Sequence, residues 1–423
     1  MELNALKDEI QDKAVEAWKQ AGKRGTIESI TGSGKNFMFL KALYTMPQDN
    51  RNTIHVFLAE TKERELDFRR DIHKFNEIFD KNVLVDYNLQ FFCYQKVYKW
   101  NKCEFGLVGC DEIHDQLTPE YVRFHLKNKC EAVLGLSALI KSSEYYTIKR
   151  DFELRNFFNK DVLNKHDMLN KIAPICFKYT ANQGQEDNTA RKLNIYVIEH
   201  TLDEFTKNIP AGNRKVPFTQ TEIKYYSYLE TLFNKALTLE QKDNETLIEF
   251  EDRKDKEIRK VAYKRSEFLY NLPSKTYAIK ILLNSIKQKT IIFGNSIKSL
   301  NDITPDAVIS SHNSDEINDD IRSDFEYNKI QTISSFKKLK QGANLPNLDV
   351  CIIKDYYSSE VDFIQRIGRL RMNGDKIGHV FIFVTKNTQE TVWFNKMIQN
   401  CNNYNYILCG SIMRAVEEYK KYI

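Results

Sequence analysis

The sequence predicts an α/β protein made of two doubly wound parallel-sheet units in tandem, joined by a helical connector. Short apolar runs typical of buried parallel strands alternate with helical periods in the first half of the chain, and this alternation returns near its end. Between them, residues 219–270 contain no strand-like run and are heavily charged. Because strand–helix alternation is typical of doubly wound sheets, we expect domains at 1–200 and 276–423 and a connector at 201–275.

The elements expected in the first half begin with a helix. Helices are expected at 5–21, 36–45 and 62–76, and strands near 26–30, 53–59, 82–86, 90–94, 105–110, 132–136 and 193–199. Two or more helices are expected within 219–270, a stretch that Pro273 closes. In the second half we expect helices at 275–287, 314–327 and 360–369, and strands near 289–293, 307–309, 330–334, 350–353 and 379–384.

Length and composition agree with two globular domains. The 423 residues are 42% hydrophobic and 29% charged, which allows each half a core and excludes a largely disordered chain. No run of eighteen apolar residues and no apolar signal core occur, so we expect no membrane contact and no secretion. The eight cysteines form no C-x-x-C pair, which favours free thiols in a reducing cytoplasm. The net charge of +5 permits a nucleic-acid partner without requiring one.

The first segment that carries chemistry is ITGSGKN at 30–36, between a strand and an apolar helix. Glycines let successive backbone N–H groups converge on a phosphate chain, and the helix N-terminus adds its dipole. Lys35 would reach the β- and γ-phosphates. Asn36 stands where a hydroxyl residue usually binds Mg2+, and its amide oxygen can take that role. The residues expected at the phosphates are Thr31, Gly32, Ser33, Gly34, Lys35 and Asn36.

The second segment is DEIH at 111–114, directly after the apolar run 105–110. A carboxylate at the end of a parallel strand lies at the same sheet edge as the phosphate loop. We therefore expect Asp111 to hold Mg2+ and Glu112 to orient and deprotonate the attacking water. An ordinary acidic turn is the alternative, and the preceding phosphate loop makes it the weaker one. For His114, coupling hydrolysis to closure and plain packing stay equally open.

The third segment is QRIGRLR at 365–371, in the second α/β unit. Phosphoryl transfer spreads negative charge over the γ-phosphate, and a guanidinium group supplied by another domain stabilises it. A solvated basic helix face is the alternative interpretation. The place of this segment in a second α/β unit favours an arginine finger.

Together these segments resemble the motifs of the DEAD/DEAH-type superfamily 2 helicases and translocases, most closely the compact phage UvsW-like and repair-helicase-like members. The order TGSGK, DEIH, LSA, QGANLP and QRIGR lies within a resemblance that covers residues 8–385. This joint order is far more specific than any single motif. The resemblance implies two RecA-like domains that hydrolyse ATP with Mg2+ and step along a nucleic acid as they close and open.

The resemblance also assigns residues to the nucleotide. Gln11 matches the glutamine that reads adenine, and Ser137-Ala138 matches a motif that couples hydrolysis to domain movement, with Leu139 in place of the usual threonine. Position 372, where the last arginine of the γ-phosphate motif usually stands, is Met, so Arg369 is the expected finger. The nucleotide-facing residues carried over are Gln11, Gly342, Gln365, Arg366, Arg369 and Arg371.

Contacts to a nucleic-acid backbone are carried over for four segments. Such contacts, mainly to phosphate and sugar, predict sequence-tolerant and salt-sensitive binding. The Glu60-Thr61 motif lacks the proline that usually precedes the threonine. The residues carried over are Glu60, Thr61, Tyr94, Gln95, Gly294, Asn295, Ser296 and Asn344.

The sequence therefore predicts an ATP- and Mg2+-dependent helicase or translocase, with DNA favoured over RNA by analogy with the compact phage members. An RNA helicase is the first alternative. The departures at Asn36, Leu139 and Arg371 motivate a second, a hydrolysis-poor nucleic-acid clamp. We expect a monomeric motor in the cytoplasm, the bacterial host's if the chain is phage-encoded, with a protein partner as a source of added specificity. The mixed-sign run 251–265 predicts a solvated helix, with duplex gripping as the minority interpretation.

Overall fold

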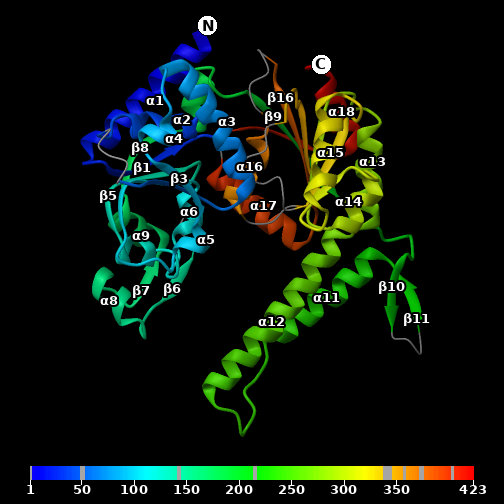
Figure 1. The fold of residues 1–423 in the computed structure, drawn as a ribbon. Coiled ribbons are helices and arrows are strands. Elements are labelled where there is room, and N and C mark those ends of the chain that lie inside the picture. The colour runs from blue at the N-terminus through cyan, green and yellow to red at the C-terminus, as the bar shows by residue number, and fades with distance from the viewer. Residues whose placement is uncertain are drawn as a thin grey trace. The chain divides into compact units, whose positions relative to one another are not determined.

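The computed structural model describes residues 2–47, 53–140, 144–212, 217–336, 345–355, 359–370, 376–401 and 404–423. Its contacts divide the chain into two compact units (Figure 1). Unit 1 contains the described residues of Met1–Lys192 together with the described part of Val361–Lys376. Unit 2 contains the other described residues. The predicted fold class, two parallel-sheet domains with surrounding helices, is confirmed.

Unit 1 is built on a six-stranded parallel sheet in the order β3-β2-β4-β5-β1-β8. Because all strands run the same way, their carboxyl ends lie at one edge of the sheet, and the loops that follow β1, β2, β4 and β5 meet there. The strands are β1 (Arg24–Ser29), β2 (His55–Ala59), β3 (Leu89–Cys93), β4 (Glu104–Cys110), β5 (Lys129–Ser137) and β8 (Ile175–Tyr179).

Helices cover this sheet. Phe57 of β2 stacks on Phe68 of α3 with ring centroids 4.0 Å apart and meets Phe39 of α2 edge-on at 4.9 Å. This buried aromatic contact fixes α2 and α3, the helices that follow the loops after β1 and β2. The helices are α1 (Glu2–Gln20), α2 (Lys35–Tyr44), α3 (Lys62–Phe79), α4 (Val83–Asp86), α5 (Tyr94–Val97), α6 (Ile113–Gln116), α7 (Arg123–Lys127), α8 (Phe152–Phe158), α9 (Lys165–Ile172) and α10 (Ala181–Glu186). An antiparallel pair of short strands, β6 (Tyr145–Thr147) and β7 (Val162–Asn164), lies beside α8 and α9.

Unit 2 contains a seven-stranded parallel sheet in the order β13-β14-β12-β15-β16-β9-β17. Its strands are β9 (Leu193–His200), β12 (Thr290–Gly294), β13 (Val308–Ser310), β14 (Thr332–Phe336), β15 (Val350–Ile353), β16 (Gly378–Thr385) and β17 (Asn405–Cys409). The flanking helices are α13 (Pro273–Leu283), α14 (Ile297–Ile303), α15 (Asp315–Glu326), α17 (Gln389–Asn400) and α18 (Ile412–Lys420). Pro273 stands at the first position of α13, where its missing N–H is harmless.

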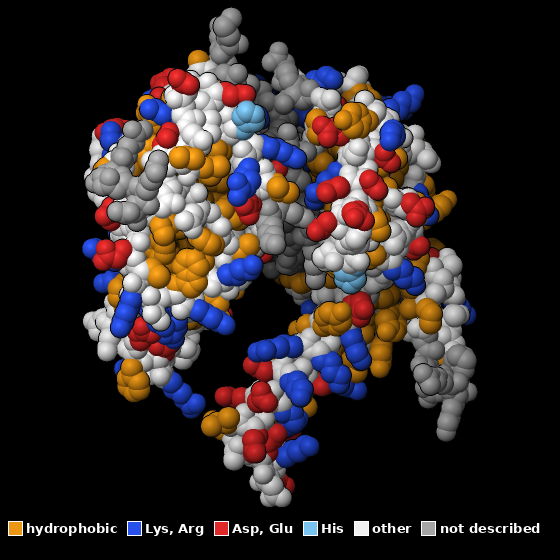
Figure 2. Space-filling view, in the orientation of Figure 1, with side chains coloured by type: hydrophobic (Ala, Val, Ile, Leu, Met, Phe, Trp, Pro, Cys, Tyr) orange, Lys and Arg blue, Asp and Glu red, His pale blue; other side chains and the backbone are white. Residues whose placement is uncertain are grey.

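The predicted helical connector is a pair of helices, α11 (Glu222–Leu237) and α12 (Leu247–Tyr270), preceded by a hairpin of β10 (Ile209–Gly212) and β11 (Pro217–Gln220). In Figure 1 the two helices extend away from the sheet of unit 2. They are joined by a small core that includes Leu229 and Leu269. Figure 2 shows Lys and Arg interspersed with Asp and Glu along the pair, as expected for a solvated helical surface.

Two details of the predicted organisation differ from the structure. The run 82–86 is the helical turn α4 and not a strand, because Asn76 and Asp86 side chains accept hydrogen bonds from the backbone N–H groups of Val83 and Asn82. The strand predicted at 193–199 is β9, which pairs with β16 and β17 of unit 2, so the N-terminal stretch of unit 1 ends at Lys192 and the strand belongs to unit 2. Within the described ranges, no helix is long and apolar enough to cross a membrane.

Candidate nucleotide and nucleic-acid site

The loop after β1 has the backbone of a phosphate-binding turn. Gly32 and Gly34 both have φ of 87°, the left-handed region that favours glycine. Gly34 is also the N-cap of α2, so the loop runs directly into a helix N-terminus. A Cβ on Gly34 would overlap Nε2 of Gln11, so a larger residue here would displace the Gln11 side chain from the loop. The predicted phosphate loop therefore has the geometry that its sequence indicates.

Gln11 lies against this loop. Its Nε2 atom donates a hydrogen bond to the backbone oxygen of Ser33 at 3.2 Å, and its side chain is buried. The Ser33 hydroxyl is 2.7 Å from the hydroxyl of Ser29 and donates to the oxygen of Ile30. Helix α1 is thereby tied to the loop, and the glutamine predicted to read adenine is placed beside it.

Lys35 and Asn36 open helix α2. The Nζ atom of Lys35 donates to the backbone oxygen of Ser29 at 3.2 Å, which holds the ammonium group within the loop. The Nδ2 atom of Asn36 donates to Oδ2 of Asp71 in α3 at 2.7 Å. Because the amide nitrogen is engaged there, the Oδ1 oxygen is the atom of Asn36 that is left for a cation.

Asp111 follows β4 and is only 3% exposed. Its Oδ2 atom accepts hydrogen bonds from two nitrogens of Arg64, Nε at 2.8 Å and Nη2. Its Oδ1 atom is buried and has no hydrogen-bond partner among the residues that the structure describes. An unsatisfied buried carboxylate oxygen is costly unless a ligand meets it. Asp111 and Asn36 offer hard oxygen atoms, so these residues fit Mg2+, which binds few protein groups and keeps phosphate and water as its other ligands.

Glu112 lies next to Asp111 in a left-handed conformation, with φ of 44°. Burial raises the pKa of its carboxyl group, but the neighbouring Lys35 and His114 lower it. Arg64 and the backbone N–H of Ala138 lower the pKa further, and the net result is a value below the ordinary one. Glu112 is therefore a carboxylate at neutral pH, the form that a general base requires.

His114 and Ser137 connect this base to the end of β5. Nδ1 of His114 is 2.8 Å from the Ser137 hydroxyl and 3.4 Å from Oε2 of Glu112. The Ser137 hydroxyl is also within 3.5 Å of Glu112 and donates to the backbone oxygen of Leu139 at 3.1 Å. His114 thus contacts residues of both motifs, and its role in coupling stays a prediction.

The predicted γ-phosphate motif lies on and after α16 (Glu360–Ile367). Gln365, Arg366 and Arg369 are all buried. A Cβ on Gly368 would overlap Oγ1 of Thr31, so the described part of 361–376 lies against the phosphate loop within unit 1. The predicted residues Arg371, Gly342 and Asn344 lie outside the described residues.

The predicted nucleic-acid contacts of unit 1 are partly exposed. Glu60 and Thr61 are exposed at the end of β2, and Thr61 caps α3 by accepting the N–H of Arg64 at 3.4 Å. Gln95 is exposed, but Tyr94 is only 6% exposed and packs edge-on against Tyr121 at 5.0 Å. Tyr94 therefore supports the segment from within the core, and Gln95 is the side chain of that pair that solvent reaches.

The predicted contacts of unit 2 lie after β12. The backbone N–H of Asn295 donates to Oδ2 of Asp355 at 2.7 Å. The hydroxyl of Ser296 donates to Oδ1 of Asn271 at 2.6 Å and caps α14. A Cβ on Gly294 would crowd Leu300, so glycine is required there for close packing. These residues form a fixed turn at the carboxyl edge of the second sheet.

Two residues of the site were not predicted from the sequence, Arg64 and Asp71. Both lie on α3, and both contact a residue predicted to bind Mg2+. The run RELDFRRD shows alternating charges typical of a solvated helix. The signal that could have found them is the position of Phe68 and Phe75, which follow Arg64 and Asp71 by four residues and are buried, so that all four share the core-facing stripe.

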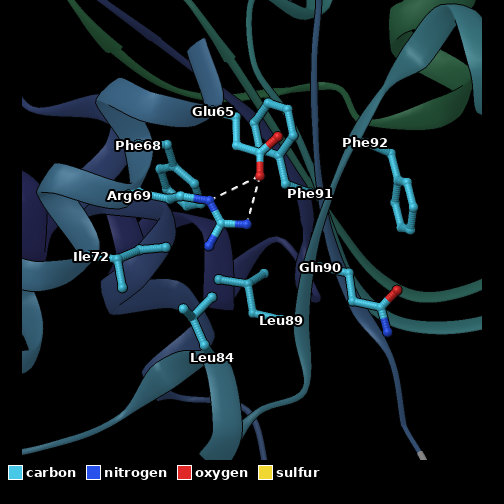
Figure 3. Close-up of a pocket in the computed structure, with 9 residues that line it drawn as sticks. All are labelled: Glu65, Phe68, Arg69, Ile72, Leu84, Leu89, Gln90, Phe91 and Phe92. Atoms are coloured by element: carbon cyan, nitrogen blue, oxygen red, sulfur yellow. Dashed lines mark hydrogen bonds and ion pairs between the residues drawn. The ribbon is translucent and has the colours of Figure 1, made fainter. Parts of the chain in front are cut away.

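A pocket of about 250 Å³ lies elsewhere on α3, against α4 and the edge strand β3. Apolar side chains line most of it, and an ion pair between Glu65 and Arg69 lies among them, as Figure 3 shows. None of the predicted site residues lines this pocket. This pocket is therefore separate from the predicted nucleotide-binding residues of unit 1.

Two family models match the chain. A model described as type III restriction enzyme, res subunit, matches residues 1–142, which include the phosphate loop and DEIH. A model of the helicase conserved C-terminal domain matches residues 274–374, which include the γ-phosphate motif. No curated protein matches the sequence. Neither model singles out the compact phage subtype, which stays a prediction.

Solved structures share the fold at low sequence identity. Dbp5 of S. cerevisiae, bound to RNA and ADP BeF3, is 12% identical with a TM-score of 0.58, over 97% of this chain and 92% of its own. The ATP-dependent type ISP restriction-modification enzyme LlaBIII, bound to DNA, is 13% identical with a TM-score of 0.54, over 98% of this chain and 32% of its own. The likeness to both extends over both units.

Proposed function

Since the chain belongs to the superfamily 2 helicases, which hydrolyse ATP, we propose that it is a motor that steps along DNA. The observation that carries the proposal is the arrangement around Asp111. A left-handed glycine loop, a buried carboxylate with one open oxygen and a deprotonated Glu112 lie at one edge of the sheet of unit 1. This set of groups is suited to binding ATP and cleaving its γ-phosphate.

The residues divide the hydrolysis reaction among them. The loop N–H groups and Lys35 bind the β- and γ-phosphates, and Gln11 reads the adenine. Asp111 and Asn36 would hold Mg2+, which would neutralise charge on the phosphate oxygens. Glu112 orients the attacking water and takes its proton. Arg369, with Gln365 and Arg366 beside it, stabilises the charge that develops on the γ-phosphate.

Hydrolysis is coupled to movement through the contact of His114 with Glu112 and Ser137, which joins the base to the end of β5. When the γ-phosphate is lost and Glu112 shifts, His114 and Ser137 shift with it, and the segment that follows β5 moves as well. Exposed Thr61 and Gln95 and the turn at Ser296 bind phosphates of the track. Because these contacts go to the backbone, affinity is salt-dependent and largely independent of sequence.

We propose DNA as the track because the motifs resemble those of the compact phage members. The similar solved structures do not decide the choice, since one is bound to RNA and one to DNA. The choice is therefore tested by steady-state ATP hydrolysis with Mg2+, alone and with single-stranded, duplex or branched DNA or with RNA. We expect the largest stimulation with a DNA. Larger stimulation by RNA makes the protein an RNA helicase, and a flat, negligible rate with ATP still bound makes it a clamp.

Variants identify the site in the same assay. Lys35→Ala removes the phosphate ligand, and Glu112→Gln removes the base while keeping its shape. Each is expected to abolish the stimulated rate. Lys129→Ala, an exposed residue at the start of β5, is the matched control and keeps the rate. Sedimentation of the active protein tests the proposed monomer, and a co-purifying protein tests the proposed partner.

A further inference from the structure

Helix α3 contacts three parts of the site. Its N-cap is Thr61, an exposed residue proposed to bind the track. Arg64, in its first turn, forms the paired hydrogen bonds to Asp111, and Asp71, about two turns further along, accepts the hydrogen bond of Asn36 at 2.7 Å. A single rigid element therefore connects one proposed nucleic-acid contact with both proposed Mg2+ ligands.

We propose that Arg64 and Asp71 are positioning residues through which a bound nucleic-acid strand controls the Mg2+ site. This inference rests on the proposed function. In the absence of a strand, Arg64 pairs with Asp111 and weakens its binding of Mg2+. When a strand phosphate lies at the N-terminal end of α3, Arg64 binds that phosphate instead. Asp71 holds the amide of Asn36 with its oxygen directed to the cation.

The contact of Arg64 sets the charge available to Mg2+. One oxygen of Asp111 accepts both Arg64 hydrogen bonds, and the other is open. A guanidinium group on a buried carboxylate cancels most of the negative charge that attracts a cation. Guanidinium groups also bind phosphate in the same paired manner, so a strand phosphate competes directly with Asp111 for Arg64. Release of Arg64 then raises the affinity of Asp111 for Mg2+.

The contact of Asp71 orients the amide group of Asn36, which stands where a hydroxyl residue is usual. A hydroxyl group presents an oxygen in any rotation, whereas an amide presents either an oxygen or an NH2 group. A carboxylate accepts hydrogen bonds only, so Asp71 selects the orientation in which the nitrogen faces it. Outer partners of this kind typically change metal affinity by about 10- to 100-fold when they are removed.

The test measures Mg2+-dependent binding of a fluorescent ADP analogue, with and without a DNA oligonucleotide. Asp71→Ala is expected to raise the Mg2+ concentration needed for half-saturation by about 10- to 100-fold. Adding Asn36→Ser in the same chain restores the wild-type requirement, because a hydroxyl needs no orientation. Glu77→Ala, on the same helix and with a 67% exposed side chain, is the matched control.

Arg64→Met is expected to act in the opposite direction. It lowers the Mg2+ requirement without oligonucleotide, and the oligonucleotide no longer changes it. In the wild type we expect the oligonucleotide to change the Mg2+ requirement by a factor on the order of 5- to 150-fold. In Arg64→Met this factor falls to about one. Arg69→Met, whose side chain is 52% exposed and paired with Glu65, keeps the wild-type coupling.

The outcomes separate this inference from the proposed function. If α3 has only a structural role, both variants bind the ADP analogue more weakly, and this result overturns the inference. Unchanged Mg2+ dependence in both variants also overturns it. Failure of Asn36→Ser to restore Asp71→Ala overturns the role of Asp71. If Arg64→Met melts far below the wild type, Arg64→Lys is tested in its place. Arg64→Lys should retain part of the coupling, because lysine keeps the charge but not the paired geometry of a guanidinium group. If no nucleic acid binds to the wild type, the proposed function fails, and the Asp71 series still tests the Mg2+ site.

Discussion

Both sheets place an aspartate just past the end of a central strand, and the two carboxylates have different surroundings. Asp111 follows β4 in unit 1, where one oxygen is paired with Arg64 and the other has no partner among the described residues. Asp355 follows β15 in unit 2, where Oδ1 accepts from Lys354 at 2.9 Å and Oδ2 from the N–H of Asn295 at 2.7 Å. We call the first strand end the open edge, because one carboxylate oxygen of Asp111 has no partner among the described residues, and the second the closed edge, because the protein bonds both oxygens of Asp355.

The closed network of unit 2 extends through buried charges. Lys275 is fully buried, donates to both oxygens of Glu390 at 2.8 and 2.9 Å, and is 4.0 Å from Asp355. Lys354 also donates to the backbone oxygen of Tyr270 at 2.6 Å. Burial of ion pairs contributes little net stability but fixes geometry when every group is satisfied. The same strand-end position therefore keeps a carboxylate oxygen unpaired among the described residues in one unit and holds the turn at Asn295 in the other.

The largest expected effect is at the open edge. Glu112→Gln is expected to lower nucleic-acid-stimulated ATP turnover by about 10²- to 10⁴-fold, because an amide cannot accept the proton of the attacking water. ATP binding, measured with a fluorescent analogue, should persist, since the phosphate loop is unchanged. Glu104→Gln, at the exposed start of the same strand, is the control. Turnover within twofold of the wild type would assign the base to another residue.

The next effect is at the closed edge. Lys275→Met leaves Glu390 buried without its cation and is expected to lower the free energy of unfolding by about 3–5 kcal/mol. Thermal and denaturant unfolding followed by circular dichroism measure this. Lys386→Met breaks the exposed pair with Glu199, whose side chains are 45% and 44% exposed, and should change stability by at most about 1 kcal/mol. Equal effects of the two substitutions would contradict the closed network.

The sequence predicts the residues around Asp111 but not the network around Asp355, because the latter depends on pairings between distant segments. Glycines in the 30–36 loop and the carboxylates after an apolar run are local signals, and the structure places both as predicted. Arg64 is 47 positions from Asp111, so the sequence shows two charges but not their contact. The sheet membership of β9 depends on β16, nearly two hundred positions later, and alternation alone does not assign a strand to a sheet.

A smaller effect concerns pH and the cations of unit 2. Burial, together with the nearby charges of Lys275 and Lys354, lowers the pKa of His200 to about 3. The unfolded chain binds a proton at this histidine below about pH 6.5 and the folded chain does not, so stability falls as pH decreases from about 6.5 toward 3. At pH 5.5 the loss from this residue is about 1.4 kcal/mol. His200→Gln should reduce the difference between unfolding free energies at pH 7 and 5.5, and His73→Gln, whose side chain is 76% exposed, should not.

The smallest expected effect separates two roles of Gln11 at the open edge. Gln11→Ala removes the hydrogen bond to Ser33, which is expected to raise KM for ATP by about 2- to 10-fold with little change in kcat. If Gln11 also reads adenine, the preference for ATP over GTP falls with it, because a lost base contact affects only the correct base. Gln20→Ala, exposed on the same helix, should change neither. A raised KM with an unchanged preference would mean that Gln11 only holds the loop, and that base selection in unit 1 lies with another group.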